Sequence, residues 1–284
     1  MKTLLAIVNE PKESKRFLFY VAGLAVNLSA QVKILTVHTP AKYPMGMTDN
    51  SGLGTLEMKR NQDIIIDESE KILKKYAGEI TEKIANHIFV EVISYTGFAA
   101  EKAEDLVSNN IVDMLVLEGQ QDDGFWLQTS SNMDIVEKVN CPIWIIPKGE
   151  IYKPFTDIVY ATDYKKEDIA SLNKLIKTFP HYTPNITALH ITDSIDFDER
   201  IKKEGFIEML QKQTAYNQLS VKAIYQSKHD DLPELINEFA IKSEADLLVL
   251  LKENKSFFKR IFNTSQTKEL LKITVLPVLV YHEK

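Results

Sequence analysis

Short apolar runs alternate with more polar stretches along the whole chain, and the order of the runs repeats. Apolar runs of four to eight residues with little polar alternation are typical of strands buried on both faces of a parallel sheet. The first series covers residues 4–8, 32–37, 89–93, 114–117 and 143–146. The second covers residues 158–161, 186–189, 221–225, 247–251 and 275–280.

The stretches between these runs carry the apolar spacing of amphipathic helices. Leu232, Ile236 and Phe239 fall on one helical face, and Asp231 and Pro233 form a helix-start signal. Strand and helix in strict alternation imply right-handed crossovers and a parallel sheet covered on both faces. We therefore predict two tandem α/β domains, each a five-stranded, doubly wound parallel sheet with helices on both faces.

Short sequence motifs that recur in both halves of the chain set the predicted domain limits. Asp113-Met114-Leu115 recurs as Asp246-Leu247-Leu248, Cys141-Pro142-Ile143 as Leu276-Pro277-Val278, and Val37-His38 as Leu189-His190. The larger offset of the last pair predicts a shorter segment between the second and third strands of the second half. We place the domains at residues 1–149 and 154–284, joined by a short polar stretch with glycine and proline. Each half ends in an apolar strand, and pairing these two strands about an internal pseudo-twofold would protect both edges.

Composition narrows the function classes. The net charge is −6 and no continuous basic stripe occurs, which disfavours a nucleic-acid partner. A single cysteine, Cys141, cannot form an internal disulfide and indicates a reducing compartment. No signal peptide or membrane span is evident in the sequence, so we expect a cytoplasmic protein without a membrane partner.

Four motifs together carry a family resemblance. They are Ala161-Thr162-Asp163, Leu189-His190, Ala245-Asp246-Leu247 and Pro277-Val278-Leu279-Val280. With these four motifs in this order, the whole chain resembles a tandem universal stress protein, in which two family domains are fused. The resemblance implies an adenine nucleotide alpha hydrolase-like fold and a stress-response role in the cytoplasm without defined chemistry.

The loop that binds nucleotide phosphates in this family is largely dismantled here. Its glycines let backbone amides approach phosphate oxygens, yet Leu251, Asn254 and Thr264 stand where the resemblance places them, and only Ser265 matches. In the first half Asn9 replaces the aspartate and Ser130-Ser131 occupies the end of the loop. Residues 119–124 have the glycine spacing of a P-loop but lack its lysine, so a phosphate cradle there is not expected.

The second half keeps the candidate site. The resemblance assigns nucleotide contacts to Ala161, Thr162, Asp163, Ile191, Asn254, Thr264, Ser265 and Gln266, with Lys252 and Lys255 as phosphate contacts. Asp163 could bind a ribose or adenine at the carboxyl end of its strand, or it could cap the helix that follows. Cationic side chains after the fourth strand could replace glycine amides, or form the solvated face of an amphipathic turn or a partner-docking surface; they are Lys252, Lys255, Lys259 and Arg260.

Other polar and aromatic residues have structural explanations that we favour. His38 and His190 lie near matching strand ends, and neither has a second His or Cys at metal-ligand spacing, so no metal site is predicted. We place Cys141 in an apolar strand, where a thiolate is disfavoured, and no nucleophilic triad can be assembled. Residues 125–127, Phe-Trp-Leu, could pack beneath their loop or form an exposed partner patch.

Three function classes follow. The first is a stress-response binding or regulatory protein that is not an enzyme, acts on an unknown protein partner or small ligand, and forms an internal pseudo-dimer or a homodimer. The second is an adenine-nucleotide binder that takes ATP or AMP in the second domain, with weak ATP hydrolysis left open. The third, an enzyme on a related nucleotide-binding fold, lacks a Ser-Gly-Gly pyrophosphate loop and a His-Ile-Gly-His motif. No cofactor is certain.

Overall fold

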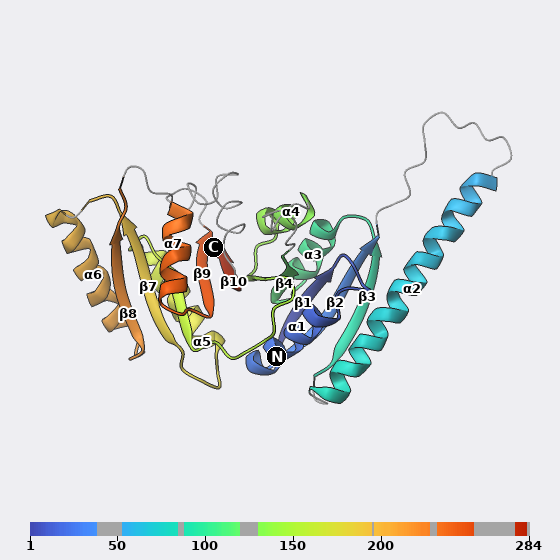
Figure 1. Ribbon diagram of the computed structural model, residues 1–284, viewed down its shortest axis with the longest axis horizontal. Helices are drawn as coiled ribbons and strands as arrows, with labels where there is room; N and C mark the ends of the chain where they lie inside the picture. The colour runs from blue at the N-terminus through green and yellow to red at the C-terminus, as the bar shows by residue number, and fades with distance from the viewer. Residues whose placement is uncertain are drawn as a thin grey trace. The chain divides into compact units, whose positions relative to one another are not determined.

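A computed structural model describes residues 1–38, 53–84, 88–119, 130–194, 196–227, 232–252 and 276–282 (Figure 1). The chain forms two compact units. Unit 1 comprises Met1–Leu117, Ser131–Val139 and Gly149–Tyr152. Unit 2 comprises Glu118–Ser130, Asn140–Lys148 and Lys153–Lys284.

Unit 1 is built on a parallel sheet with strand order β3-β2-β1-β4. Helices α1 and α2 contact each other and cover the same face, because both crossovers step in the same direction along the sheet. The elements are β1 (Lys2–Val8), α1 (Lys15–Leu28), β2 (Ala30–His38), α2 (Leu53–Lys83), β3 (Val90–Thr96), α3 (Ala99–Ser108), β4 (Met114–Glu118) and α4 (Ser130–Lys138).

Unit 2 contains the strand order β5-β10-β9-β6-β7-β8, parallel except for the pair β5 and β10. Helices α5 and α6 contact each other, as α1 and α2 do in unit 1. The elements are β5 (Ile143–Ile146), β6 (Asp157–Ala161), α5 (Lys166–Thr178), β7 (Asn185–Thr192), α6 (Phe197–Gln213), β8 (Leu219–Tyr225), α7 (Leu232–Lys242), β9 (Leu247–Lys252) and β10 (Val278–His282).

The predicted fold class is confirmed, because each predicted apolar run corresponds to a strand in the predicted order. Strands β1, β4, β6 and β9 are almost wholly buried, which explains why they read as continuous apolar runs. The segment between the second and third strands is shorter in the second repeat because the helix that it contains is shorter. Helix α2 has 31 residues, whereas α6 has 17.

The two final strands pair with each other, as the edge argument predicts. β5 and β10 run antiparallel, with Leu279 opposite Trp144 and Val278 opposite Ile145. Pro142 and Pro277 show that Leu279 and Trp144 are equivalent in the two repeats, so the pair has local twofold symmetry. Because β5 lies with β10, the compact units divide the chain differently from the repeats. The limits 1–149 and 154–284 stay a prediction.

Trp144 anchors this strand pair in the core of unit 2. Its side chain is fully buried and stacks on Phe155 with ring centroids 5.7 Å apart. Phe179 lies edge-on to both rings. Aromatic clusters of this kind bury large apolar areas and add favourable ring contacts, so they fix β5 against the helical layer.

The aspartate that opens the fourth strand of each repeat is structural. Asp113 accepts a hydrogen bond from the Thr3 backbone N–H at 2.7 Å, at the start of β1. Asp246 does the same for Thr156 at 2.8 Å and also accepts from the Thr156 hydroxyl. These bonds join the amino ends of neighbouring parallel strands, so part of the family-like motif reflects strand alignment rather than ligand binding.

Candidate functional site at the carboxyl ends of the unit 2 strands

Several predicted site residues meet at one edge of unit 2. Strand β6 lies between β9 and β7 and is parallel to both, so the carboxyl ends of the three strands lie side by side. Asp163 follows β6, Ile191 is the penultimate residue of β7, and Lys252 ends β9. Ala161 ends β6, and Thr162 connects it to Asp163. This is the edge at which open α/β sheets bind ligands.

Other predicted residues lie outside the described part of the chain. These are Asn254, Lys255, Lys259, Arg260, Thr264, Ser265 and Gln266, together with Phe125, Trp126 and Leu127. The phosphate-loop predictions and the aromatic-loop prediction therefore stay predictions.

Asp168 is the centre of a buried hydrogen-bond network at this edge. Its carboxylate is fully buried and accepts bonds from the Tyr160 hydroxyl at 2.9 Å and the Thr162 hydroxyl at 2.8 Å. It also accepts from the backbone N–H groups of Asp163 at 3.0 Å and Lys165 at 3.1 Å. Burial nevertheless raises the pKa of Asp168. The network fixes the path of the chain from β6 into α5.

Tyr164 turns sharply within this loop. Its φ of 61° is in the left-handed region, which non-glycine residues rarely adopt. The Thr162 hydroxyl accepts a hydrogen bond from its backbone N–H at 3.0 Å. The ring stacks on His190 with centroids 4.1 Å apart and packs on Phe206 at 5.1 Å. Burial, and then the nearby carboxylate of Glu199, raise the pKa of the Tyr164 hydroxyl.

His190 is held on both sides of its ring. Nδ1 donates to the Thr162 carbonyl at 2.7 Å, and Nε2 lies 3.0 Å from the Glu199 carboxylate of α6. Both side chains are largely buried, with exposed fractions of 12% and 13%. The satisfied-histidine interpretation is therefore confirmed for His190.

The capping alternative for Asp163 is not what the structure shows. Helix α5 begins after Lys165, and the carboxylate that accepts its N-terminal backbone bond is that of Asp168. Asp163 instead lies two residues earlier, with its side chain 7% exposed and one oxygen 3.5 Å from the Lys165 ammonium. Of the two alternatives that the sequence left open for Asp163, capping is therefore wrong, and the capping carboxylate belongs to Asp168, five residues further along the chain.

The described residues of unit 1 do not form this network. Leu4 is opposite Met114 as Ile158 is opposite Leu247, so the two first strands are equivalent at these positions. The same register equates Ser14 with Asp168 and Asn9 with Asp163. Ser14 is buried, but its hydroxyl bonds to the nearby Pro11 carbonyl at 2.9 Å. The hydrogen-bond network around the Asp168 carboxylate is thus a feature of unit 2.

The two histidines are also not equivalent, contrary to the sequence match. Leu4 is opposite Val32, and Ile158 is opposite Ile186. Counting along both strands from these positions equates His190 with Thr36 and places His38 two residues beyond. A two-residue shift keeps the same face of a strand, which is why the apolar pattern alone allowed the wrong alignment.

Sequence reasoning missed Asp168, Glu199 and Phe206 as members of this site. A signal for Asp168 exists, because a carboxylate three residues into a helix is typical of N-terminal capping. No local signal exists for Glu199 and Phe206, which reach the site from α6. Among the residues that the structure describes, no group of three or more His, Cys, Asp and Glu side chains could hold a metal ion.

The comparison with protein families decides the identity of the fold. The model of the universal stress protein family matches residues 1–147, more than half of the chain. The chain belongs to the universal stress protein family. No curated protein sequence matches this universal stress protein.

Solved structures extend the likeness to the whole of this universal stress protein. The crystal structure of a universal stress protein from Archaeoglobus fulgidus DSM 4304 is 14% identical, with a TM-score of 0.72, and the match covers 99% of this chain and 96% of that one. The cytoplasmic domain of a prokaryotic cation chloride cotransporter is 11% identical, with a TM-score of 0.54, and the match covers 98% and 94%. At these identities the matches show a shared fold.

Proposed function

We propose that this universal stress protein acts by binding rather than by catalysis, as a regulatory component of a stress response. Family membership supports the general role. One observation supports the absence of catalysis: Asp168 and His190, two groups with acid–base chemistry at the described edge of unit 2, are held in internal contacts. Asp168 accepts four hydrogen bonds, and both nitrogens of His190 face acceptors. A general acid or base must instead reach a substrate proton.

A phosphate-release assay tests this proposal. The full chain is incubated with ATP and Mg²⁺ beside His190→Gln and a protein-free blank. We expect both proteins to match the blank. Phosphate release by the wild-type chain above the blank would overturn the proposal. Loss of that release in His190→Gln would further place the imidazole in the reaction.

We propose adenine-nucleotide binding as the second candidate function, with ATP or AMP as the ligand. The observation that favours it is the shared edge on which Asp163, Ile191 and Lys252 lie, at adjacent parallel strand ends. A carboxylate there can accept hydrogen bonds from a ribose or an adenine amino group, and a lysine can contact phosphate.

Calorimetric titration with ATP and AMP, with and without Mg²⁺, separates the two candidates. Nucleotide binding predicts a micromolar signal that Asp163→Ala abolishes. Asp198→Ala is the matched control, since Asp198 is an exposed carboxylate on α6 and should leave the signal unchanged. Flat titrations, or equal signals from both variants, would discard the nucleotide candidate.

We also propose a cytoplasmic location, which the single cysteine of the sequence supports. No helix among the described residues is both long and apolar enough to cross a membrane. Cell fractionation with an epitope-tagged chain tests the location. Light scattering on the purified chain distinguishes an internal pseudo-dimer, at the monomer mass, from a homodimer.

A further inference from the structure

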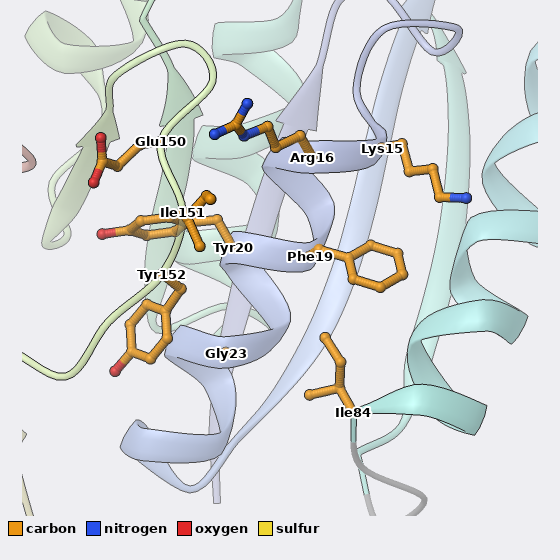
Figure 2. Close-up of a pocket in the computed structure, with 9 residues that line it drawn as sticks. All are labelled: Lys15, Arg16, Phe19, Tyr20, Gly23, Ile84, Glu150, Ile151 and Tyr152. Carbon is orange, nitrogen blue, oxygen red and sulfur yellow. The ribbon is translucent and has the colours of Figure 1, made fainter.

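Unit 1 contains a pocket of about 580 Å³ beside α1. It is lined by Lys15, Arg16, Phe19, Tyr20, Gly23, Ile84, Glu150, Ile151 and Tyr152 (Figure 2). All of these residues belong to unit 1, because the segment Gly149–Tyr152 packs with it. The volume is within the range of small-molecule sites, which are mostly apolar with a few polar groups.

Aromatic and aliphatic side chains form the walls. Phe19 and Ile84 lie on one side of α1, and Tyr20, Ile151 and Tyr152 lie on the other (Figure 2). The Tyr20 and Tyr152 rings meet edge to face, with centroids 5.3 Å apart. These rings restrict each other, so this wall is rigid and apolar.

Gly23 makes this arrangement of the wall possible. A Cβ atom on Gly23 would lie 2.5 Å from the Tyr152 ring, closer than carbon atoms approach. The absence of a side chain therefore lets the ring lie directly on α1. Glycine in a helix interior costs about 1 kcal/mol relative to alanine. That cost is offset here by the close approach of the segment that carries Tyr152.

The charged lining residues are not equivalent. The Lys15 ammonium is 2.6 Å from the Glu79 carboxylate and lies over the Tyr76 ring at 5.6 Å, so it is already engaged. Among the described residues, no ion pair involves the Arg16 guanidinium, which lies at the upper end of the pocket in Figure 2. Glu150 is the acidic residue of the lining.

We propose that this pocket binds a small amphiphilic carboxylate, with its apolar body against the aromatic walls and its carboxylate on Arg16. Guanidinium and carboxylate match in geometry and form paired, charge-assisted hydrogen bonds. Glu150 disfavours a doubly charged head group such as a phosphate monoester, because like charges repel at the same rim. The site is independent of the unit 2 edge, and its test does not depend on the nucleotide titration.

Calorimetry on the full chain with three probes tests the proposal. Decanoate has both the apolar body and the carboxylate, decan-1-ol has the body alone, and acetate has the charge alone. We expect one decanoate per chain, with decan-1-ol at least about tenfold weaker, as for loss of a charge-assisted bond, and no signal from acetate. Arg16→Gln should weaken decanoate by about the same factor.

Arg60→Gln is the matched control, because Arg60 is an exposed arginine of unit 1 that does not line the pocket. It should bind decanoate as the wild type does. Phe19→Ala, which removes wall area and keeps the charge, should weaken decanoate and decan-1-ol by the same factor. Equal decanoate affinity in Arg16→Gln and wild type, or equal affinity for the acid and the alcohol, would overturn the proposal. A wild-type chain that binds no decanoate, for instance because a second copy covers this face, would overturn it as well.

Discussion

Removal of the Asp168 carboxylate should destabilise unit 2 strongly. One carboxylate oxygen accepts from Tyr160, and the other accepts from Thr162 and from two backbone N–H groups. Asp168→Ala deletes all four acceptor contacts in a fully buried position. Buried donors that lose their acceptor cost about 1–3 kcal/mol each before relaxation. We therefore expect a loss of about 3–5 kcal/mol in the free energy of unfolding, as for a broken buried network.

Asp168→Asn should cost much less. The amide oxygen can take the place of the carboxylate oxygen that accepts three bonds. The amide nitrogen then faces the Tyr160 hydroxyl, which can accept as well as donate. The network is kept with one bond reversed, so we expect a loss of about 1 kcal/mol.

Denaturant unfolding measures both losses. Trp144 is fully buried in unit 2, and its fluorescence reports this unit once the second tryptophan is replaced in a Trp126→Phe background. Asp198→Ala, an exposed substitution, should change the unfolding free energy by less than about 0.5 kcal/mol. If Asp168→Ala and Asp168→Asn cost the same, or if the alanine variant costs under about 1 kcal/mol, the network does not stabilise the fold as argued.

The pH dependence follows from the direction of the pKa shift. Burial raises the pKa of Asp168 above its ordinary value of 3.8, so the folded chain binds this proton more tightly than the unfolded chain. The stabilising contribution is complete below the unfolded pKa and is lost as the pH rises through the folded pKa. The stability difference between wild type and Asp168→Asn should therefore be larger at about pH 4 than at about pH 7. The opposite trend would show that the hydrogen bonds outweigh burial.

Two further predictions concern other polar contacts of unit 2. Burial opposes the ionisation of Asp246, but hydrogen bonds from Lys153 and Thr156 outweigh burial and lower the pKa of Asp246. The stability advantage of wild type over Asp246→Asn, measured by urea unfolding, should therefore shrink as the pH falls below about 4. A pH-independent difference would contradict this. Thr178 and Tyr281 share a buried hydrogen bond of 3.1 Å, so Thr178→Val should lower the unfolding free energy by about 1–3 kcal/mol and Thr178→Ser should restore most of it. Equal stability of the valine and serine variants would assign the effect to packing.

The sequence by itself determined the order of the elements and the fold class. Buried parallel strands must be apolar on both faces, so β1, β4, β6 and β9 can be recognised in the sequence as continuous apolar runs. The need to protect strand edges also predicted that β5 and β10 pair. The strand assignments succeed because the period and length of an apolar run depend on local geometry, and the pairing succeeds because an unpaired apolar strand edge is unfavourable.

Tertiary structure decided which polar groups meet. Glu199 and Phe206 come from α6 and lie beside His190 and Tyr164 only once α6 packs, so no spacing in the sequence reveals them. Register decided that His190 matches Thr36, because a shift of two residues leaves the apolar pattern of a strand unchanged. The pocket beside α1 likewise exists only when Gly149–Tyr152 folds back onto Gly23. Side-chain contacts between distant segments depend on how the elements pack, and no single segment of the sequence determines that packing.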